Sequence, residues 1–83
     1  MNTITFNAVV NAAFEANQNF GKKIAIAGQS STAVEYALKV TVDKNKEPKK
    51  WVLMDREDGE VVATFAYYYT FAETCEAILT FIR

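Results

Sequence analysis

The densest group of ionisable side chains is a run of carboxylates around a single glycine. Asp55, Glu57, Asp58 and Glu60 make up the run, with Gly59 between the last two. Paired carboxylates can transfer protons in acid–base catalysis or hold a hard cation such as Ca²⁺. The spacing does not fit an EF-hand loop, because the glycine comes one position early and the distant bidentate glutamate is missing. We expect a solvated acidic turn, which could also contact a basic partner.

The side chains that carry most chemistry near neutral pH are scarce. The 83 residues include no histidine, one cysteine and three separated glycines. Histidine is the usual proton carrier and metal ligand at this pH. The lone cysteine, Cys75, is expected to be a buried structural thiol, because a reactive thiolate needs exposure and positive neighbours. A nucleophilic Ser30 or Ser31 would have only a lysine as its base. We therefore predict no catalytic residue, cofactor or metal site.

A second charged cluster is basic and falls in a polar stretch marked by Pro48. Its members are Lys44, Lys46, Lys49 and Lys50. Neighbouring lysines can bind phosphates and release counterions. However, Asp43 and Glu47 dilute its positive charge, and the cluster contains no arginine for forked phosphate contacts. The chain as a whole carries a net charge of −1, whereas nucleic-acid-binding domains are usually strongly basic. Direct nucleic-acid binding through residues 44–50 is therefore the alternative rather than the preferred function.

The run Tyr67, Tyr68 and Tyr69 is the best aromatic candidate for a contact surface. Consecutive strand residues point to alternate faces, so a strand through this run would place Tyr68 opposite its neighbours. Tyrosine is enriched in interfaces, because its rigid ring buries a large area while its hydroxyl keeps a hydrogen bond. Tyr68 and Tyr69 are thus predicted to bind a partner.

Two helices are expected to hold these groups, over residues 5–20 and from Thr70 onward. Thr5 can cap the first, Gly21 can end it, and Thr70–Glu73 matches a capping box that begins the second. The apolar face of the first helix is expected to contain Phe6, Val9, Val10, Ala13 and Phe14. That of the second is expected to contain Phe71, Cys75, Ile78, Leu79 and Ile82. The outer face of the first helix is nearly uncharged and could serve self-association through Asn7, Asn11 and Gln18, so a homodimer stays open.

Four strands are predicted between the helices, over residues 22–27, 33–43, 51–56 and 61–69. The second has the clearest alternation, with apolar side chains at every other position from Val34 to Val42. A helix beginning at the capping-box match Thr32–Glu35 is the alternative there, but the β-branched content favours a strand.

The turn at residues 57–59 decides which face of the sheet holds Trp51. A three-residue loop with Gly59 in the left-handed conformation is predicted. It gives the pairs Arg56–Glu60, Leu53–Ala63 and Trp51–Phe65. A two-residue loop would slip the register by one residue and turn Trp51 to the opposite face.

The predicted fold is a single α+β domain over residues 1–83, in the order helix, four strands, helix. Short connections favour an antiparallel meander, and the single apolar stripe on each helix places both on one sheet face. The other face is expected to be flat, with small side chains and few charges. Its expected members are Glu35, Ala37, Lys39, Thr41, Val62, Thr64, Ala66 and Tyr68.

The helix–strands–helix order resembles that of double-stranded RNA-binding domains, which grip phosphates with a lysine-rich start to the last helix. Here that segment is Thr70–Glu73, and its carboxylate would repel phosphate. In size, charge balance and lack of catalytic residues, the chain resembles small phage-encoded inhibitors, anti-CRISPR proteins among them. That resemblance implies a viral, non-enzymatic domain that blocks a host complex by occupying a surface.

The expected partner is a host protein or complex with a basic surface, such as a nucleic-acid-handling complex of the CRISPR type. The predicted contact residues are Asp55, Glu57, Asp58, Glu60, Tyr68, Tyr69, Glu73 and Glu76. With a lone cysteine, no signal peptide and no apolar stretch approaching a membrane span, we expect a cytoplasmic protein without membrane contact.

Overall fold

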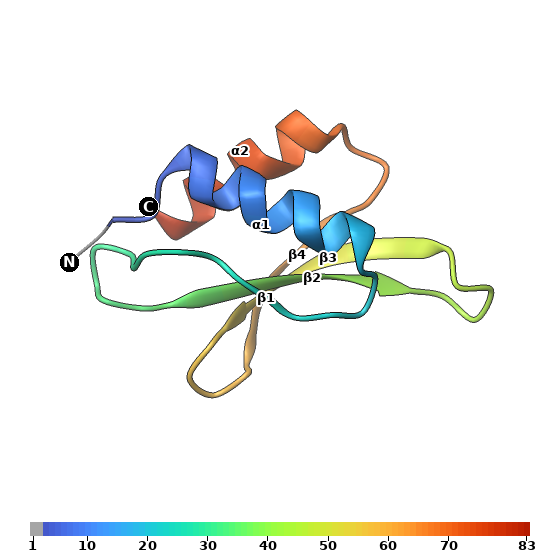
Figure 1. The fold of residues 1–83 in the computed structure, drawn as a ribbon, viewed down its shortest axis with the longest axis horizontal. Coiled ribbons are helices and arrows are strands. Elements are labelled where there is room, and N and C mark those ends of the chain that lie inside the picture. The colour runs from blue at the N-terminus through green and yellow to red at the C-terminus, as the bar shows by residue number, and fades with distance from the viewer. Residues whose placement is uncertain (1–2) are drawn as a thin grey trace.

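The computed structural model describes residues 3–83 and has two helices and four strands (Figure 1). In chain order they are α1 (Phe6–Gln18), β1 (Ile24–Ala25), β2 (Tyr36–Val42), β3 (Pro48–Asp55), β4 (Val61–Ala66) and α2 (Phe71–Ile82). The strands form one antiparallel sheet in the order β1-β2-β3-β4. This is the α+β meander that the hydrophobic pattern predicts. Neither helix within residues 3–83 is long and apolar enough to cross a membrane.

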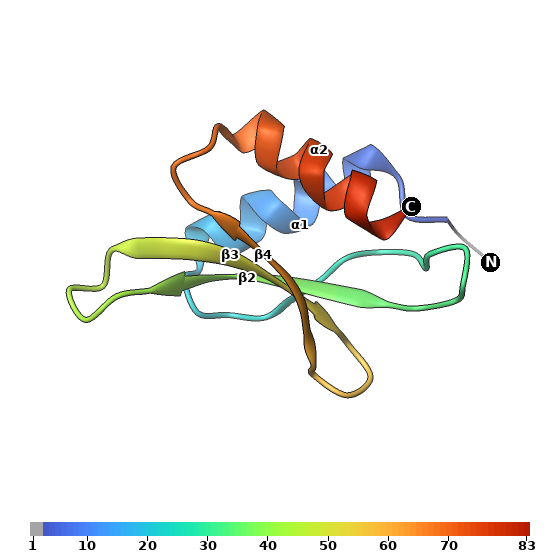
Figure 2. The ribbon, with the colours of Figure 1, turned by 180° about the vertical axis from the view of Figure 1, so that it is seen from behind.

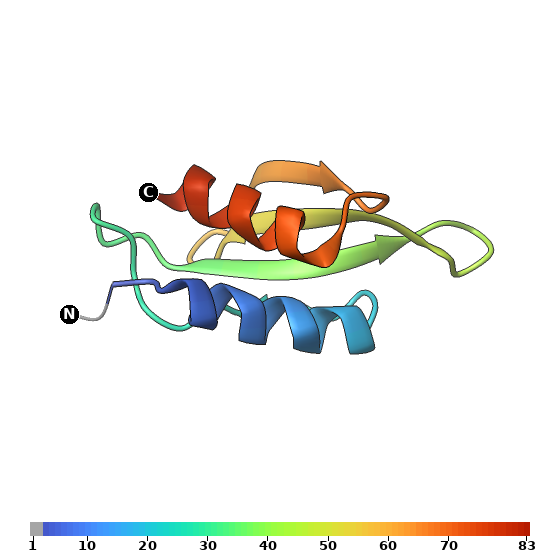
Figure 3. The same ribbon diagram turned by 90° about the horizontal axis from the view of Figure 1, so that it is seen from above.

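Both helices cover the same face of the sheet and run in opposite directions (Figures 1 and 3). α1 packs on β1 and β2 and against α2. The Thr5 side chain caps α1 by accepting a hydrogen bond from the Ala8 amide at 3.1 Å. The predicted capping box of α2 is also present, between Thr70 and Glu73. Each helix therefore begins where its sequence signal predicts.

The buried stripe of α1 differs from the predicted one. It consists of Val9, Ala12, Ala13 and Ala16. Phe14 is 59% exposed and Phe6 is 40% exposed, so the two phenylalanines lie outside the core. The stripe is rich in alanine, and small side chains let the helix axis approach the sheet closely. On α2 the predicted stripe is buried except for Phe71, which is 37% exposed but contacts the Trp51 ring, and Thr74 is buried in addition.

β2 is a strand, as preferred, but it begins at Tyr36 rather than Ala33. Ala33 has a positive φ of 64°, which interrupts extended structure. The Ser30 hydroxyl oxygen accepts hydrogen bonds from the amides of Thr32 and Val34. These local bonds form a turn instead of a strand or a helix. Ser30 is thereby a buried turn residue, not an exposed nucleophile.

The β3–β4 hairpin has the predicted register along most of its length. Trp51 pairs with Phe65 and Leu53 with Ala63. Gly59 has a φ of 73°, the left-handed conformation expected for it. Trp51 is 2% exposed and lies in the main core between sheet and helices. The alternative register, with Trp51 on the outer face, is therefore wrong.

The register changes toward the hairpin tip. Met54 pairs with Val61, which leaves Val62 as an extra residue in a β-bulge. The predicted Arg56–Glu60 pair is consequently not formed. Bulges increase the local twist of a sheet, and the tip bends away from the helices in Figures 1 and 2.

The sheet face opposite the helices is not the flat, small-residue surface that was expected. Ala37, Val52 and Met54 form a second buried cluster on it. Lys39 and Lys50 are partly buried beside this cluster and add positive charge. The alternation correctly placed Ala37 on this face, but Val52 and Met54 of the neighbouring strand β3 cluster with it and it is buried.

Candidate partner-binding surfaces

The carboxylate run lies on the β3–β4 loop, and we call Asp55, Glu57, Asp58 and Glu60 the acidic tip. The tip protrudes from the sheet on the side away from the helices (Figure 2). The Asp55 amide donates to the Glu60 carbonyl at 2.9 Å, which closes the loop. The loop is therefore held by the backbone as well as by its glycine.

Two of the four carboxylates at the acidic tip are used to build the loop. The Asp55 carboxylate accepts from the Glu57 amide at 2.8 Å, and the Asp58 carboxylate accepts from the Glu60 amide at 2.8 Å. Such side-chain-to-backbone bonds are typical of tight turns. Glu57 and Glu60 are exposed, and within residues 3–83 neither carboxylate has an ion-pair partner. The tip thus presents negative charge on a fixed backbone.

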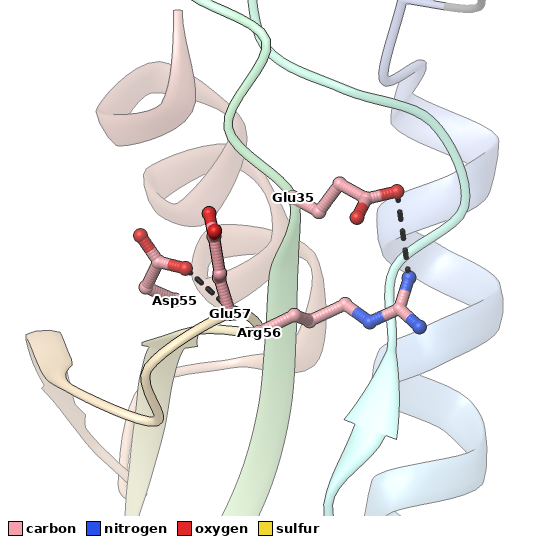
Figure 4. A network of polar contacts seen from close by, with 4 residues as sticks. All are labelled: Glu35, Asp55, Arg56 and Glu57. Atoms are coloured by element: carbon pink, nitrogen blue, oxygen red, sulfur yellow. Dashed lines mark hydrogen bonds and ion pairs between the residues drawn. The ribbon is translucent and has the colours of Figure 1, made fainter.

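The nearest cation points away from the acidic tip. Arg56 forms an ion pair with Glu35 at 3.8 Å, and its amide donates to the Glu35 carbonyl at 3.0 Å (Figure 4). Both side chains are about half exposed, so the ion pair contributes less than about 1 kcal/mol to stability. Its larger effect is geometric, because it directs the arginine toward β2 and leaves the carboxylates of Asp55 and Glu57 unneutralised.

The described part of the chain contains no group of three potential metal ligands among its histidine, cysteine, aspartate and glutamate side chains. At the acidic tip, Asp55 and Asp58 already bind amides of their own loop. The arrangement suits contact with a positively charged surface better than enclosure of an ion.

The three tyrosines lie in the turn after β4 and not in the strand. The strand ends at Ala66, so the predicted alternation of faces does not apply. Tyr67 stacks on Trp51 with ring centroids 5.7 Å apart, and its hydroxyl bonds to Asn17. Tyr68 and Tyr69 are 82% and 51% exposed, and their rings contact each other at 4.7 Å. We call Tyr68 and Tyr69 the tyrosine pair.

Hydrogen bonding and electrostatic interaction with Tyr68 raise the pKa of Tyr69 above its ordinary value. The Tyr69 hydroxyl therefore keeps its proton at neutral pH. The tyrosine pair presents two adjacent rings with polar hydroxyls, a suitable combination for a protein contact.

The two glutamates predicted on α2 differ in role. Glu73 accepts from the Thr70 hydroxyl at 2.8 Å and from the Thr70 amide at 3.2 Å. The Thr70 hydroxyl and amide hold the pKa of Glu73 below its ordinary value. Glu73 is thus a helix-capping residue, whereas Glu76 is exposed in the next turn.

The eight predicted contact residues form two groups rather than one patch. The acidic tip is on one side of the sheet, and the tyrosine pair lies with Glu73 and Glu76 at the start of α2 on the other (Figure 2). β4 separates them, since it begins after the tip and ends before Tyr67. The sequence indicates each group but not their separation.

The lysine cluster lies at the end of the sheet opposite the acidic tip, in and after the β2–β3 turn (Figure 1). The Asp43 carboxylate accepts from the amides of Asn45 and Glu47 and shapes this turn. Lys49 is the extra residue of a β-bulge in β3, between Pro48, which pairs with Val42, and Lys50, which pairs with Thr41. The sheet consequently has a basic end and an acidic end.

One feature was not recognised from the sequence, the open edge of β4, although Val62, Thr64 and Ala66 were expected on the exposed sheet face. Val61 and Val62 are 54% and 36% exposed. The strand carries no charge from Val61 to Ala66, an unusual composition for the edge of a sheet. That composition is visible in the sequence, but the position of this strand at the edge is not.

Comparison of the chain with protein-family models, curated proteins and solved structures found no match. The structure defines a small α+β domain with a four-stranded antiparallel sheet. Its function is therefore inferred from its surfaces.

Proposed function

We propose that the chain is a non-enzymatic protein-binding module whose acidic tip occupies a basic surface of a host protein or complex. The observation that carries this proposal is the tip itself. It combines a backbone-fixed loop with protruding glutamates that lack ion-pair partners in the described chain. A preformed loop loses little conformational entropy on binding, and complementary charge speeds association and selects the partner.

A basic groove that normally receives nucleic acid is the partner surface that best suits this loop. Such grooves place several lysines and arginines where phosphates bind. The closely spaced carboxylates of the acidic tip carry negative charge, as those phosphates do, on a rigid protrusion. We propose on this basis that the module is an inhibitor from a phage or other mobile element, which masks a site on a nucleic-acid-handling complex of the CRISPR type.

The tyrosine pair and Glu76 form a second, smaller contact in this proposal. Because they lie across the sheet from the acidic tip, a single flat partner surface cannot reach both groups. A partner that engages both must extend around the β4 edge. Loss of the acidic tip should therefore weaken binding more than loss of the tyrosine pair.

The test is co-purification from the native host followed by measurement of affinity for the captured protein. The variant carries Glu57→Lys and Glu60→Lys, which leave the loop-building Asp55 and Asp58 in place. Its control carries Glu15→Lys and Glu47→Lys, the same change in net charge elsewhere on the surface. We expect the tip variant to lose at least about tenfold in affinity, equivalent to about 1.4 kcal/mol, and the control to lose much less.

Two results would contradict the proposal. One is the absence of any specific protein partner. The other is an equal loss in both variants, which would mean that net charge and not the acidic tip controls binding. Affinity that also falls with added salt would agree with a charged contact.

The basic end of the sheet supports a second candidate, direct nucleic-acid binding. Lys44, Lys46 and Lys49 are exposed at this end. This candidate predicts affinity for nucleic acid that falls steeply with salt and is abolished when these lysines become glutamate. The overall negative charge and the acidic tip oppose it.

A further inference from the structure

β4 is an edge strand without the usual protection. Within residues 3–83 it pairs with β3 alone, and in Figure 3 it lies beyond α2 at the border of the sheet. An edge strand presents unpaired backbone amides and carbonyls, and proteins normally guard them with lysine, proline or a covering segment. The residues of β4 are Val61, Val62, Ala63, Thr64, Phe65 and Ala66. None of them is charged, and the bulge distorts only the start of the strand.

A groove runs beside this edge on the helix side. Its volume is about 330 Å³, and it is lined by Phe65, Tyr69, Glu73, Thr74 and Ala77. Phe81 is 48% exposed on the same helix. A strand added beside β4 would cover apolar surface on this side, in addition to satisfying the backbone groups of the edge.

We propose that a second copy of this chain pairs with β4 in the antiparallel direction, so that two four-stranded sheets join into one of eight strands. The two-fold axis passes through Thr64. Antiparallel partners place their side chains on the same face. Ala63 and Phe65 face the helices, as their packing on the main core shows, so Thr64 points to the other face. Only a register that preserves these faces buries the apolar side chains.

The axis at Thr64 gives self-complementary neighbours. Thr64 meets Thr64 of the second copy, Ala63 meets Phe65, and Val62 meets Ala66. Each phenylalanine ring thus lies beside an alanine and not beside another ring. Thr–Thr and apolar cross-strand pairs are favourable neighbours. No charged residue enters this set of pairs.

Charge also favours a second copy in this orientation. The acidic tip precedes β4, and the lysine cluster lies at the other end of the sheet, where Lys50 pairs with Ala66. An antiparallel copy brings the acidic tip of each chain to the basic end of the other. A second copy of this chain carries both the acidic tip and the lysine cluster. A strand from another protein would need basic and acidic groups of its own at the matching positions.

The experiment measures the mass of the purified chain in solution over a range of concentrations, by light scattering or sedimentation. We expect the wild type to approach twice the 9.3 kDa mass of one chain as concentration rises. Thr64→Lys places two ammonium groups opposite each other at the axis, so its dimer dissociation constant should rise at least several-fold. Thr64 is exposed in the single chain, so the variant is expected to fold, which circular dichroism checks.

A cross-linking variant tests the register without destabilising the pair. In Thr64→Cys the two cysteines lie directly opposite each other across the axis. Their Cβ atoms are then about 4.5–5.5 Å apart, as in other directly opposite pairs. Mild oxidation should give a covalent dimer at protein concentrations where the control Thr80→Cys, exposed on α2, stays monomeric.

The inference does not depend on the proposed function, because its readout is the mass of the purified chain and not partner capture. It is overturned if the wild type is monomeric at all concentrations, if Thr64→Lys dimerises as well as the wild type, or if both cysteine variants cross-link equally. A monomer whose β4 edge instead binds a strand of another protein would likewise overturn it.

Discussion

At the scale of single residues, position determines what each carboxylate does. Asp55, Asp58 and Glu73 accept hydrogen bonds from backbone amides and hold local structure. Glu57 and Glu60 lie close to Asp55 and Asp58 in the sequence, but their carboxylates form no ion pair within residues 3–83 and are exposed. The residue type and spacing alone suggested one acidic set. The hydrogen bonds divide that set into structural and available members.

Cys75 provides a prediction at this scale. The thiol is fully buried, and burial raises its pKa. We expect a thiol reagent at pH 8 to modify the folded chain only when it opens. For a domain stable by about 5 kcal/mol, labelling should be slower than in denaturant by on the order of 10³-fold.

The measurement is the rate of labelling with and without denaturant, and Thr80→Cys is the control because its thiol would be exposed. Equal rates for Cys75 in the folded and denatured chain would show that the thiol is accessible. The prediction of a structural cysteine would then be wrong.

At the scale of elements, the ends of helices were more predictable than the ends of strands. Thr5 and the Thr70–Glu73 box cap their helices as their types imply, because capping is a local hydrogen-bonding effect. β1, β2 and β4 are shorter than expected, and β3 begins at Pro48, three residues before the expected start. β2 begins after a turn in which Ala33 is left-handed, and local bonds to the Ser30 hydroxyl hold that turn. β4 ends before a turn that holds Tyr67 against Trp51, which is an effect of tertiary packing.

Acid should weaken the start of α2. The lowered pKa of Glu73 means that the folded chain favours its carboxylate, so this contribution is present above the ordinary glutamate pKa of about 4.3. It is lost as the pH falls through the lowered value, because the unfolded chain then binds more protons. Glu73→Gln should therefore be less stable than the wild type at pH 7, and this difference should vanish toward pH 2.

Urea unfolding of wild type and Glu73→Gln at both pH values checks the acid prediction, with Glu76→Gln as the exposed control on the same helix. A difference between wild type and Glu73→Gln that is the same at both pH values would show that the ionised carboxylate does not stabilise the cap.

At the scale of the whole molecule, two features organise the surface. The helices cover one sheet face and leave the acidic tip projecting from the other (Figure 1). The acidic tip and the lysine cluster lie at opposite ends of the strands, so a chain with a net charge of −1 has two charged poles. The proposed contact with a basic partner uses one pole, and the proposed antiparallel dimer brings opposite poles together.

The two-layer architecture predicts which large side chains stabilise it. Leu53 is fully buried in the central strand β3, between sheet and helices. Leu53→Ala should lower the free energy of unfolding by about 2–5 kcal/mol. Phe14 is 59% exposed, and alanine is the better helix former. Phe14→Ala should therefore change the free energy of unfolding by less than about 1 kcal/mol.

Chemical unfolding of the two variants beside the wild type checks this ranking. A larger loss from Phe14→Ala than from Leu53→Ala would place the phenylalanine in the core and contradict the orientation of α1. Circular dichroism should show unchanged secondary structure in both variants, so that the difference in stability reports on side-chain packing.

The sequence by itself determined the order of elements, the residues that begin both helices and the helix-facing side of β2. It favoured the register that buries Trp51 but did not decide it. These features follow from period, capping and turn chemistry, which act between near neighbours in the chain. Only the tertiary structure decided that Phe14 is exposed, that Arg56 turns to Glu35, that the acidic tip and tyrosine pair are separated, and that β4 has an open edge. Those outcomes depend on which distant segments meet, and the packing of the sheet against two helices sets them.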